Sequence, residues 1–163
     1  MSSPLRVRFP LQNSKKPVSI KKDGTYLLAY RSIDKAGNVE ETHEREWKLD
    51  QTPPQVKASV DKPALSPVNH ELVPIQVSLA YSDSLSGIQS AELASITSNE
   101  PDMDPSDIQD ADFGTEDTSF MLRAERTGSG KKNSPRIYSI TYVVKDKAGN
   151  AASQVVKVTV PRK

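Results

Sequence analysis

Residues 24–38 read GTYLLAYRSIDKAGN, and residues 136–150 read RIYSITYVVKDKAGN. The two stretches have tyrosines at the same two places and end in the same pentapeptide, with a constant offset of 112 positions, as from Asp34 to Asp146. A period of this length is too long for a solenoid repeat and fits one β-sandwich domain of roughly 100 residues. The sequence therefore predicts tandem β-sandwich modules.

The composition favours short strands over long helices. The 163 residues are 35% hydrophobic and include 12 prolines, and the abundant serine, threonine and valine suit strands joined by turns. A net charge of +1 gives no strong field, so we expect no nucleic-acid partner. No stretch approaches the ~18 apolar residues of a membrane span, so we expect no membrane insertion. The absence of cysteine excludes disulfides and leaves the compartment open.

A pair of prolines divides the chain into two predicted domains. Pro53 and Pro54 donate no ladder hydrogen bonds and favour extended backbone, so we expect a short, stiff link there. After the link, residues 52–163 are predicted to form one complete antiparallel sandwich. Its expected strands are 56–60, 72–81, 88–97, 120–126, 137–145 and 153–160, each bounded by turn-rich sequence.

The part of the chain before the link is shorter than the repeat. Strand patterns occur at residues 5–9 and from Tyr26 to Ile33, and Trp47 and Leu49 predict a half-buried final strand with an inward tryptophan. About 50 residues precede the link although the repeat is 112, so residues 1–51 are predicted to be the carboxy-terminal part of a truncated first domain. The alternative is a short complete sandwich, or a sheet docked on the second copy.

Several ordered motifs in the second copy resemble one family. The sequence is similar to bacterial Ig-like repeats of the hyalin-repeat type over about residues 53–160, and residues 24–54 resemble the tail of a related surface Ig-like domain. The motifs that carry the resemblance are SPVNHELVP at 66–74, SNEPD at 98–102, LRAER at 122–126 and RIYSITY at 136–142.

The resemblance implies an all-β fold, an Ig-like antiparallel β-sandwich preceded by a partial, truncated Ig-like β domain. It also implies a non-catalytic, extracellular or cell-surface module of a larger bacterial protein, acting as a spacer, adhesion or interaction unit. Neighbouring Ig-like domains are the implied partners, with a glycan or a surface protein as further candidates. The alternative function is a carbohydrate-binding accessory module of a secreted hydrolase, which an exposed row of aromatic side chains would favour.

A calcium site is predicted at one pole of the sandwich. In an Ig-type topology, the loop at 82–87 and the loop from Asp146 to Asn150 share a pole with the start of the first strand. Asp50 enters at that pole, so Asp50, Asp83, Asp146 and Asn150 form a predicted interdomain calcium set, because oxygen ligands suit this hard cation. The structural alternative is that each DKAGN aspartate accepts hydrogen bonds from nearby backbone amides in a tight turn.

A second candidate site lies in the acidic stretch at 98–118, which we expect to leave the sandwich as a long loop. Its closely spaced carboxylates are suited to wrap calcium. The residues assigned to this loop site are Asp102, Asp104 and Asp107. The alternative is a solvated loop whose acids pair with Arg123 and Arg126, with Glu100 and Arg123 as the best-placed structural ion pair.

The remaining polar residues argue against catalysis. His43 and His70 lack neighbouring nucleophiles or acids that would complete a triad, and no glycine-rich phosphate loop opens a helix. We therefore expect no enzyme and no cofactor, calcium excepted. Tyr26 and Tyr138 are expected to be core residues that also act as tyrosine corners, tying each strand entry to backbone.

Overall fold

The computed structural model describes residues 19–126 and 134–162, which fall into two compact units. The first unit comprises the chain up to Thr52 together with Ser84–Ser86, and the second comprises Pro53–Asp83 and the chain from Gly87 onward. The predicted strand at residues 5–9 lies outside the described residues.

The first unit contains a two-stranded antiparallel sheet made of β1 (Gly24–Tyr30) and β2 (His43–Leu49). Gly24 pairs with Leu49 and Tyr30 with His43, and an isolated bridge between Ile33 and Val39 continues the pairing toward the turn. The predicted strand from Tyr26 to Ile33 is thus confirmed over residues 26–30, although the observed strand begins earlier, at Gly24, and ends at Tyr30. The final strand is longer than the sequence pattern indicated, because its polar residues also pair across the hairpin.

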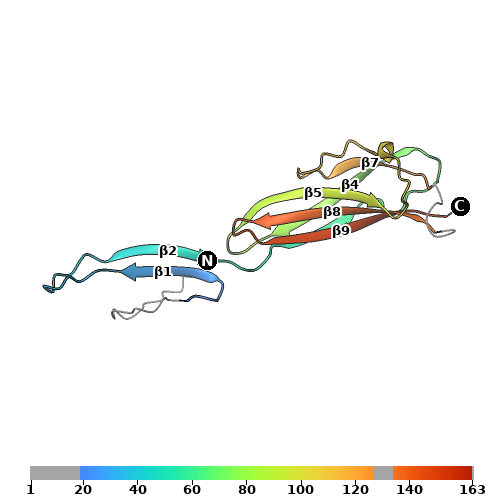
Figure 1. Ribbon diagram of the computed structural model, residues 1–163. Coiled ribbons are helices and arrows are strands. Elements are labelled where there is room, and N and C mark those ends of the chain that lie inside the picture. Colours follow the sequence, from blue (N-terminus) through green and yellow to red (C-terminus); the bar gives the residue numbers. More distant parts are fainter. Residues whose placement is uncertain (1–18, 127–133, 163) are drawn as a thin grey trace. The chain divides into compact units, whose positions relative to one another are not determined.

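The second unit is a β-sandwich built from two antiparallel sheets, as Figure 1 shows. One sheet has the order β3-β4-β7-β6 and the other β5-β8-β9, and the part of the chain that the structure describes contains no α-helix. Consequently no described segment is a helix long and apolar enough to cross a bilayer. The elements are β3 (Gln55–Val60), β4 (Leu72–Ser82), β5 (Ile88–Ser98), the 3₁₀ turn η1 (Pro105–Asp107), β6 (Ile108–Gln109), β7 (Ser119–Arg123), β8 (Arg136–Asp146) and β9 (Ala151–Val160).

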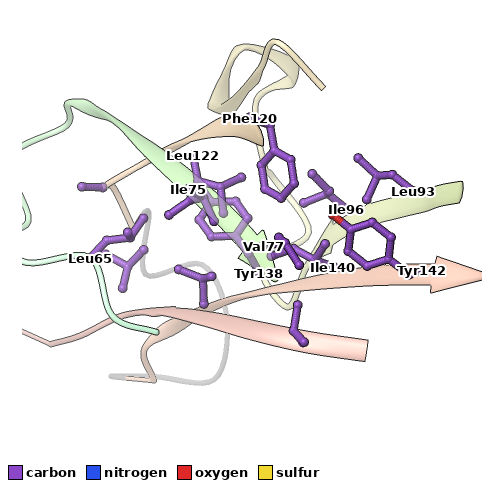
Figure 2. Close-up of a cluster of buried hydrophobic side chains, with 14 residues drawn as sticks. Leu65, Ile75, Val77, Leu93, Ile96, Phe120, Leu122, Tyr138, Ile140 and Tyr142 are labelled. Atoms are coloured by element: carbon purple, nitrogen blue, oxygen red, sulfur yellow. The ribbon is translucent and has the colours of Figure 1, made fainter. Parts of the chain in front are cut away.

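Strand β8 runs through the centre of its sheet and supplies the inner face of the sandwich. Its side chains alternate between the two faces, and Tyr138, Ile140 and Tyr142 are completely buried. Figure 2 shows them facing side chains of β4 and β7, among them Ile75 and Phe120. Burying a side chain of this size stabilises a fold by about 1.5–3 kcal/mol, so β8 accounts for much of the apolar stabilisation.

Most residues of the acidic stretch are exposed and irregular, as expected of a long loop, but the stretch stays attached to the sandwich, which the sequence prediction did not foresee. It forms η1 and the short strand β6, which pairs with β7 at the edge of the four-stranded sheet. Met103, Ile108 and Ala111 pack against the core from this segment. The segment is therefore an integral part of the second unit, held by apolar contacts as well as by the charges described below.

Candidate functional sites

The two DKAGN turns have the same hydrogen bonds in both units. Oδ1 of Asp34 accepts from the backbone N–H groups of Ala36 and Asn38 at 2.9 Å each, and Oδ2 accepts from the Asn38 side-chain amide at 2.7 Å. Asp146 repeats this pattern, with 2.9 and 2.8 Å to the backbone amides and 2.8 Å to the Asn150 amide. The structural interpretation of the pentapeptide is confirmed.

The glycine in each turn is required by the backbone conformation. Gly37 has a φ angle of 91° and Gly149 of 94°, in the left-handed region that side-chain-bearing residues rarely adopt. The hydrogen bonds of Asp34 lower the pKa of its carboxyl group, first through the Asn38 side chain and then through the backbone. The charged carboxylate is therefore the form that closes this turn.

Three of the four residues predicted to bind interdomain calcium lie together in the second unit. Carboxylate oxygens of Asp83 and Asp146 lie within 4.8 Å of each other, and Asn150 is bonded to Asp146 as described above. Oδ1 of Asp83 also accepts from the Gly87 N–H at 2.7 Å, and the Gly87 carbonyl accepts from Lys147 at 2.9 Å. The two loops are thus tied together by backbone and carboxylate bonds at one pole of the sandwich.

Asp50, the fourth residue of that set, belongs to the first unit. Its carboxylate is 8% exposed and accepts from the backbone N–H groups of Thr52 at 3.1 Å and Ser86 at 3.0 Å. Nearby, Asp23 accepts from Gln51 and from the Thr52 hydroxyl, and these bonds, that of Thr52 first, lower the Asp23 pKa. A calcium site that joins Asp50 to the residues of the second unit stays a prediction.

A buried ion network fastens the acidic segment to the sandwich. Arg136, at the start of β8, is 0% exposed, and its Nε donates to Glu100 at 2.6 Å while its Nη1 donates to Asp107 at 2.7 Å and to the Tyr138 hydroxyl at 3.0 Å. The other oxygen of Asp107 accepts from Arg123 Nε at 2.9 Å. One carboxylate therefore bridges two guanidinium groups from different sheets.

The partners in this network confirm one part of the sequence prediction and correct another. An acid of the loop, Asp107, pairs with Arg123 as expected. We expected Glu100 to pair with Arg123, but Glu100 pairs with Arg136 and Arg123 pairs with Asp107. Burial disfavours the charge on Arg136, yet its bonds to Glu100, Tyr138 and Asp107 outweigh this and raise the Arg136 pKa above its ordinary value. The sequence contained a signal for this residue, because Arg136 lies at an inward position two residues before Tyr138.

The three residues of the predicted loop calcium site have separate surroundings. Asp104 caps η1, and its Oδ1 accepts from the Ser106 N–H at 2.7 Å, which lowers the Asp104 pKa. Asp107 faces the two arginines, whereas Asp102 is exposed. A cation at Asp107 would be repelled by the two neighbouring guanidinium groups. The geometry therefore favours a role for this carboxylate in ion pairing with the arginines over a role in binding calcium. Calcium binding by this loop stays a prediction.

An aromatic face on the hairpin β1–β2 is the other candidate site. The strand register places Tyr26 opposite Trp47, and Tyr30 opposite His43, on the same side of the two strands. The expected packing of Trp47 was wrong for the part of the chain that the structure describes, because the side chain is 54% exposed and Tyr30 is 45% exposed. The Tyr30 and His43 rings lie 5.5 Å apart between centroids. This hairpin therefore presents flat, exposed rings that sequence alternation alone assigned to a core.

The two corner tyrosines differ between the units. Tyr26 is 7% exposed, and its hydroxyl donates to the Lys22 carbonyl, four residues earlier, which confirms the predicted corner. Tyr138 is a core residue as predicted, but its hydroxyl donates to the Arg123 carbonyl on β7 at 3.0 Å. In the second unit this tyrosine links the two sheets and does not form a local corner.

Comparisons of the chain with protein-family models, with curated proteins and with solved structures found no match. The family resemblance of the motifs therefore stays a prediction.

Proposed function

We propose that this chain is a non-catalytic Ig-like module of a larger bacterial secreted or surface protein, where it acts as a spacer, adhesion or interaction unit. The observation that carries the proposal is the repeated turn, whose hydrogen bonds at Asp34 and Asp146 are the same in both units. Such repetition is typical of tandem modules built by duplication, in which the sandwich itself is the working part. The partners we propose are neighbouring Ig-like domains.

The mechanism we propose is mechanical. A sandwich filled by side chains such as Tyr138 and Tyr142 resists deformation, because opening it exposes packed apolar surface to water. The Pro53-Pro54 pair restricts the backbone between modules. A series of such units holds its outermost module away from the cell surface, which is the role of a spacer.

A replacement experiment tests this function. In the parent polypeptide, residues 53–162 are exchanged for an unrelated β-sandwich of similar length, and attachment of the bacteria to their natural surface is measured. A spacer tolerates the exchange, so attachment is retained. Loss of attachment, with the parent still displayed at the surface, would show that this sandwich carries a specific binding site, and the spacer proposal would fail.

One observation favours the alternative, a carbohydrate-binding accessory module. Exposed Trp47 and Tyr30 share one face of β1–β2, and aromatic rings of this kind stack on sugar rings. If this function is right, a glycan array shows binding that Trp47→Ala and Tyr30→Ala abolish. The matched control is Phe113→Ala, which removes a 49% exposed ring in the second unit and leaves binding unchanged. An array without any bound glycan would exclude this alternative.

A further inference from the structure

We propose that the apolar face of the hairpin is the inner face of a sandwich, and that it binds a second β layer. The apolar residues of this β1–β2 face are Tyr26, Leu28, Tyr30, Trp47 and Leu49, and the register places Arg45 and His43 on the same side, opposite Leu28 and Tyr30. The occupant we assign is a β layer of the same polypeptide, on the amino-terminal side of the hairpin and outside the part of the chain that the structure describes. The inference rests on the proposed modular function and names the partner of one module.

The second unit provides the internal precedent for this assignment. Strands β8 and β9 form an antiparallel hairpin with the same DKAGN turn as β1 and β2. In register, Tyr26 lies opposite Trp47 as Tyr138 lies opposite Val158. The inward positions of the two hairpins therefore correspond through this cross-strand pairing and the alternation of side chains along each strand. The turn alone does not set them, because the Ile33–Val39 bridge matches Lys145–Ala151 at the offset of 112, whereas Trp47 is one residue out of that offset from Val158.

Corresponding positions differ in exposure. Ile140 and Tyr142 are both 0% exposed, whereas their counterparts Leu28 and Tyr30 are 44% and 45% exposed. In the second strand Val158 is 0% exposed, and Trp47 is 54% exposed. Large apolar side chains at positions that are buried in one copy and exposed in the other indicate a surface that another element covers.

The covering layer of the second unit indicates the chemistry of the occupant. Tyr138, Ile140 and Tyr142 are covered by branched aliphatic and phenylalanine side chains on β4 and β7, as Figure 2 shows. Both strands precede β8 in the chain. By the same order, the occupant of the β1–β2 face precedes Gly24 and presents alternating aliphatic and aromatic residues, because strands that pack one face alternate with period two.

The isolated hairpin also has a physical need for a partner. A two-stranded sheet in water is marginally stable, and a third strand or a second layer is required for independent stability. One position of the face indicates a polar group on the occupant. Arg45 is the partner of Leu28 in the first hairpin, whereas the partner of Ile140 in the second hairpin is the apolar Val156. A guanidinium on a mostly apolar face requires an acceptor when covered, so we expect the occupant to place a carboxylate or a free carbonyl at the end of the face that holds Arg45 and His43.

Site-specific photo-crosslinking in the full polypeptide, as its own gene expresses it, tests this inference. A benzophenone amino acid replaces Leu28 on the proposed interface, and in a matched control it replaces Glu46, whose register position is on the opposite face of the hairpin. After illumination and digestion, mass spectrometry identifies the linked peptides. The expected result is a cross-link from position 28 to a segment of the same polypeptide before Gly24, and no such link from position 46.

Trp47, the single tryptophan among residues 1–163, gives a second measurement once any tryptophan elsewhere in the full polypeptide is replaced by phenylalanine. When the layer is in place, Trp47 emission shifts to shorter wavelength and acrylamide quenching falls several-fold relative to the unfolded chain. A cross-link from position 28 to a different protein, equal links from both positions, no link at all, or a glycan that protects Trp47 would each overturn the proposal. The spacer function is tested by a different experiment, the exchange of residues 53–162. A failure of the proposed covering layer is therefore distinguishable from a failure of the proposed spacer function.

Discussion

Removal of Arg136 is expected to have a large effect on stability, larger than that of any surface charge. The side chain is completely buried and neutralises Glu100, which is 2% exposed, while sharing Asp107 with Arg123. Arg136→Met keeps much of the side-chain volume but leaves the Glu100 carboxylate buried without this cation. Removing one partner of a buried pair costs about 3–5 kcal/mol, because the remaining charge loses its compensation.

Total stabilities of small domains are about 5–15 kcal/mol, so this single substitution removes a large part of the free energy of unfolding. At roughly 4 °C per kcal/mol for a unit of this size, we expect the thermal midpoint to fall by roughly 12–20 °C. The double variant Arg136→Met with Glu100→Leu replaces both charges by apolar groups and recovers much of the loss. One reason is that Arg136 Nη2 is buried without a hydrogen-bond partner among the described residues, so the native pair already includes an unsatisfied donor.

Urea unfolding of the wild type, the two single variants and the double variant measures these differences as a thermodynamic cycle. Lys145→Met is the matched control, because Lys145 makes an exposed pair with Glu92 at 3.3 Å and such pairs contribute less than about 1 kcal/mol. If Arg136→Met costs no more than the control, or if the double variant is as unstable as the two single losses added together, the buried pair of Arg136 and Glu100 does not stabilise the sandwich in this way.

Three further predictions concern protons and calcium. Burial, and to a smaller extent the nearby Asp117, raises the pKa of Tyr142 from 10.0 to about 12. Because Tyr142 of the unfolded chain ionises at lower pH than in the folded protein, the free energy of unfolding falls between about pH 10 and pH 12. Unfolding curves measured across this pH range should show a smaller fall for Tyr142→Phe. The pKa of Asp34 is lowered, so its carboxylate stabilises the turn above pH 3.8, and the stabilisation is lost as pH falls through the lowered pKa. The measurement is the protection factor of the Asn38 amide, its intrinsic exchange rate divided by the observed rate, which should fall with falling pH in the wild type and not in Asp34→Asn. If calcium binds through Asp83 and Asp146, a hundredfold excess over its Kd stabilises the fold by about 2.7 kcal/mol, so a thermal midpoint that neither calcium nor a chelator moves would exclude the calcium predictions.

The parts of the fold that followed from the sequence are those set by local pattern. The predicted strands at 72–81, 88–97 and 137–145 match β4, β5 and β8 closely, because alternating apolar residues between turn signals specify both strand and buried face. The DKAGN turn was equally predictable. Its aspartate, glycine and asparagine form a complete hydrogen-bonding unit within five residues, which makes the conformation independent of distant parts of the chain.

The parts that were missed depend on residues far apart in sequence. The pairing of the acidic segment with Arg123 was foreseen, and Asp107 confirms it, but the buried Arg136 was missed because it lies on a strand that the local pattern does not connect to Glu100 and Asp107. The error at Trp47 has a different cause. Alternation correctly places Trp47 on the same face as Leu49, yet it carries no information on whether a second layer covers that face.

The self-sufficient turn has a consequence for how such proteins diversify. Because Asp146 and Asn150 bond to each other and to the local amides, the conformation of the turn is determined mainly by its own five residues. A gene segment encoding it can be copied or recombined into a new array without matching changes elsewhere. We therefore expect the pentapeptide to be kept in copies of the module whose other residues have diverged, so that it identifies the repeating unit by which an array of modules gains or loses length.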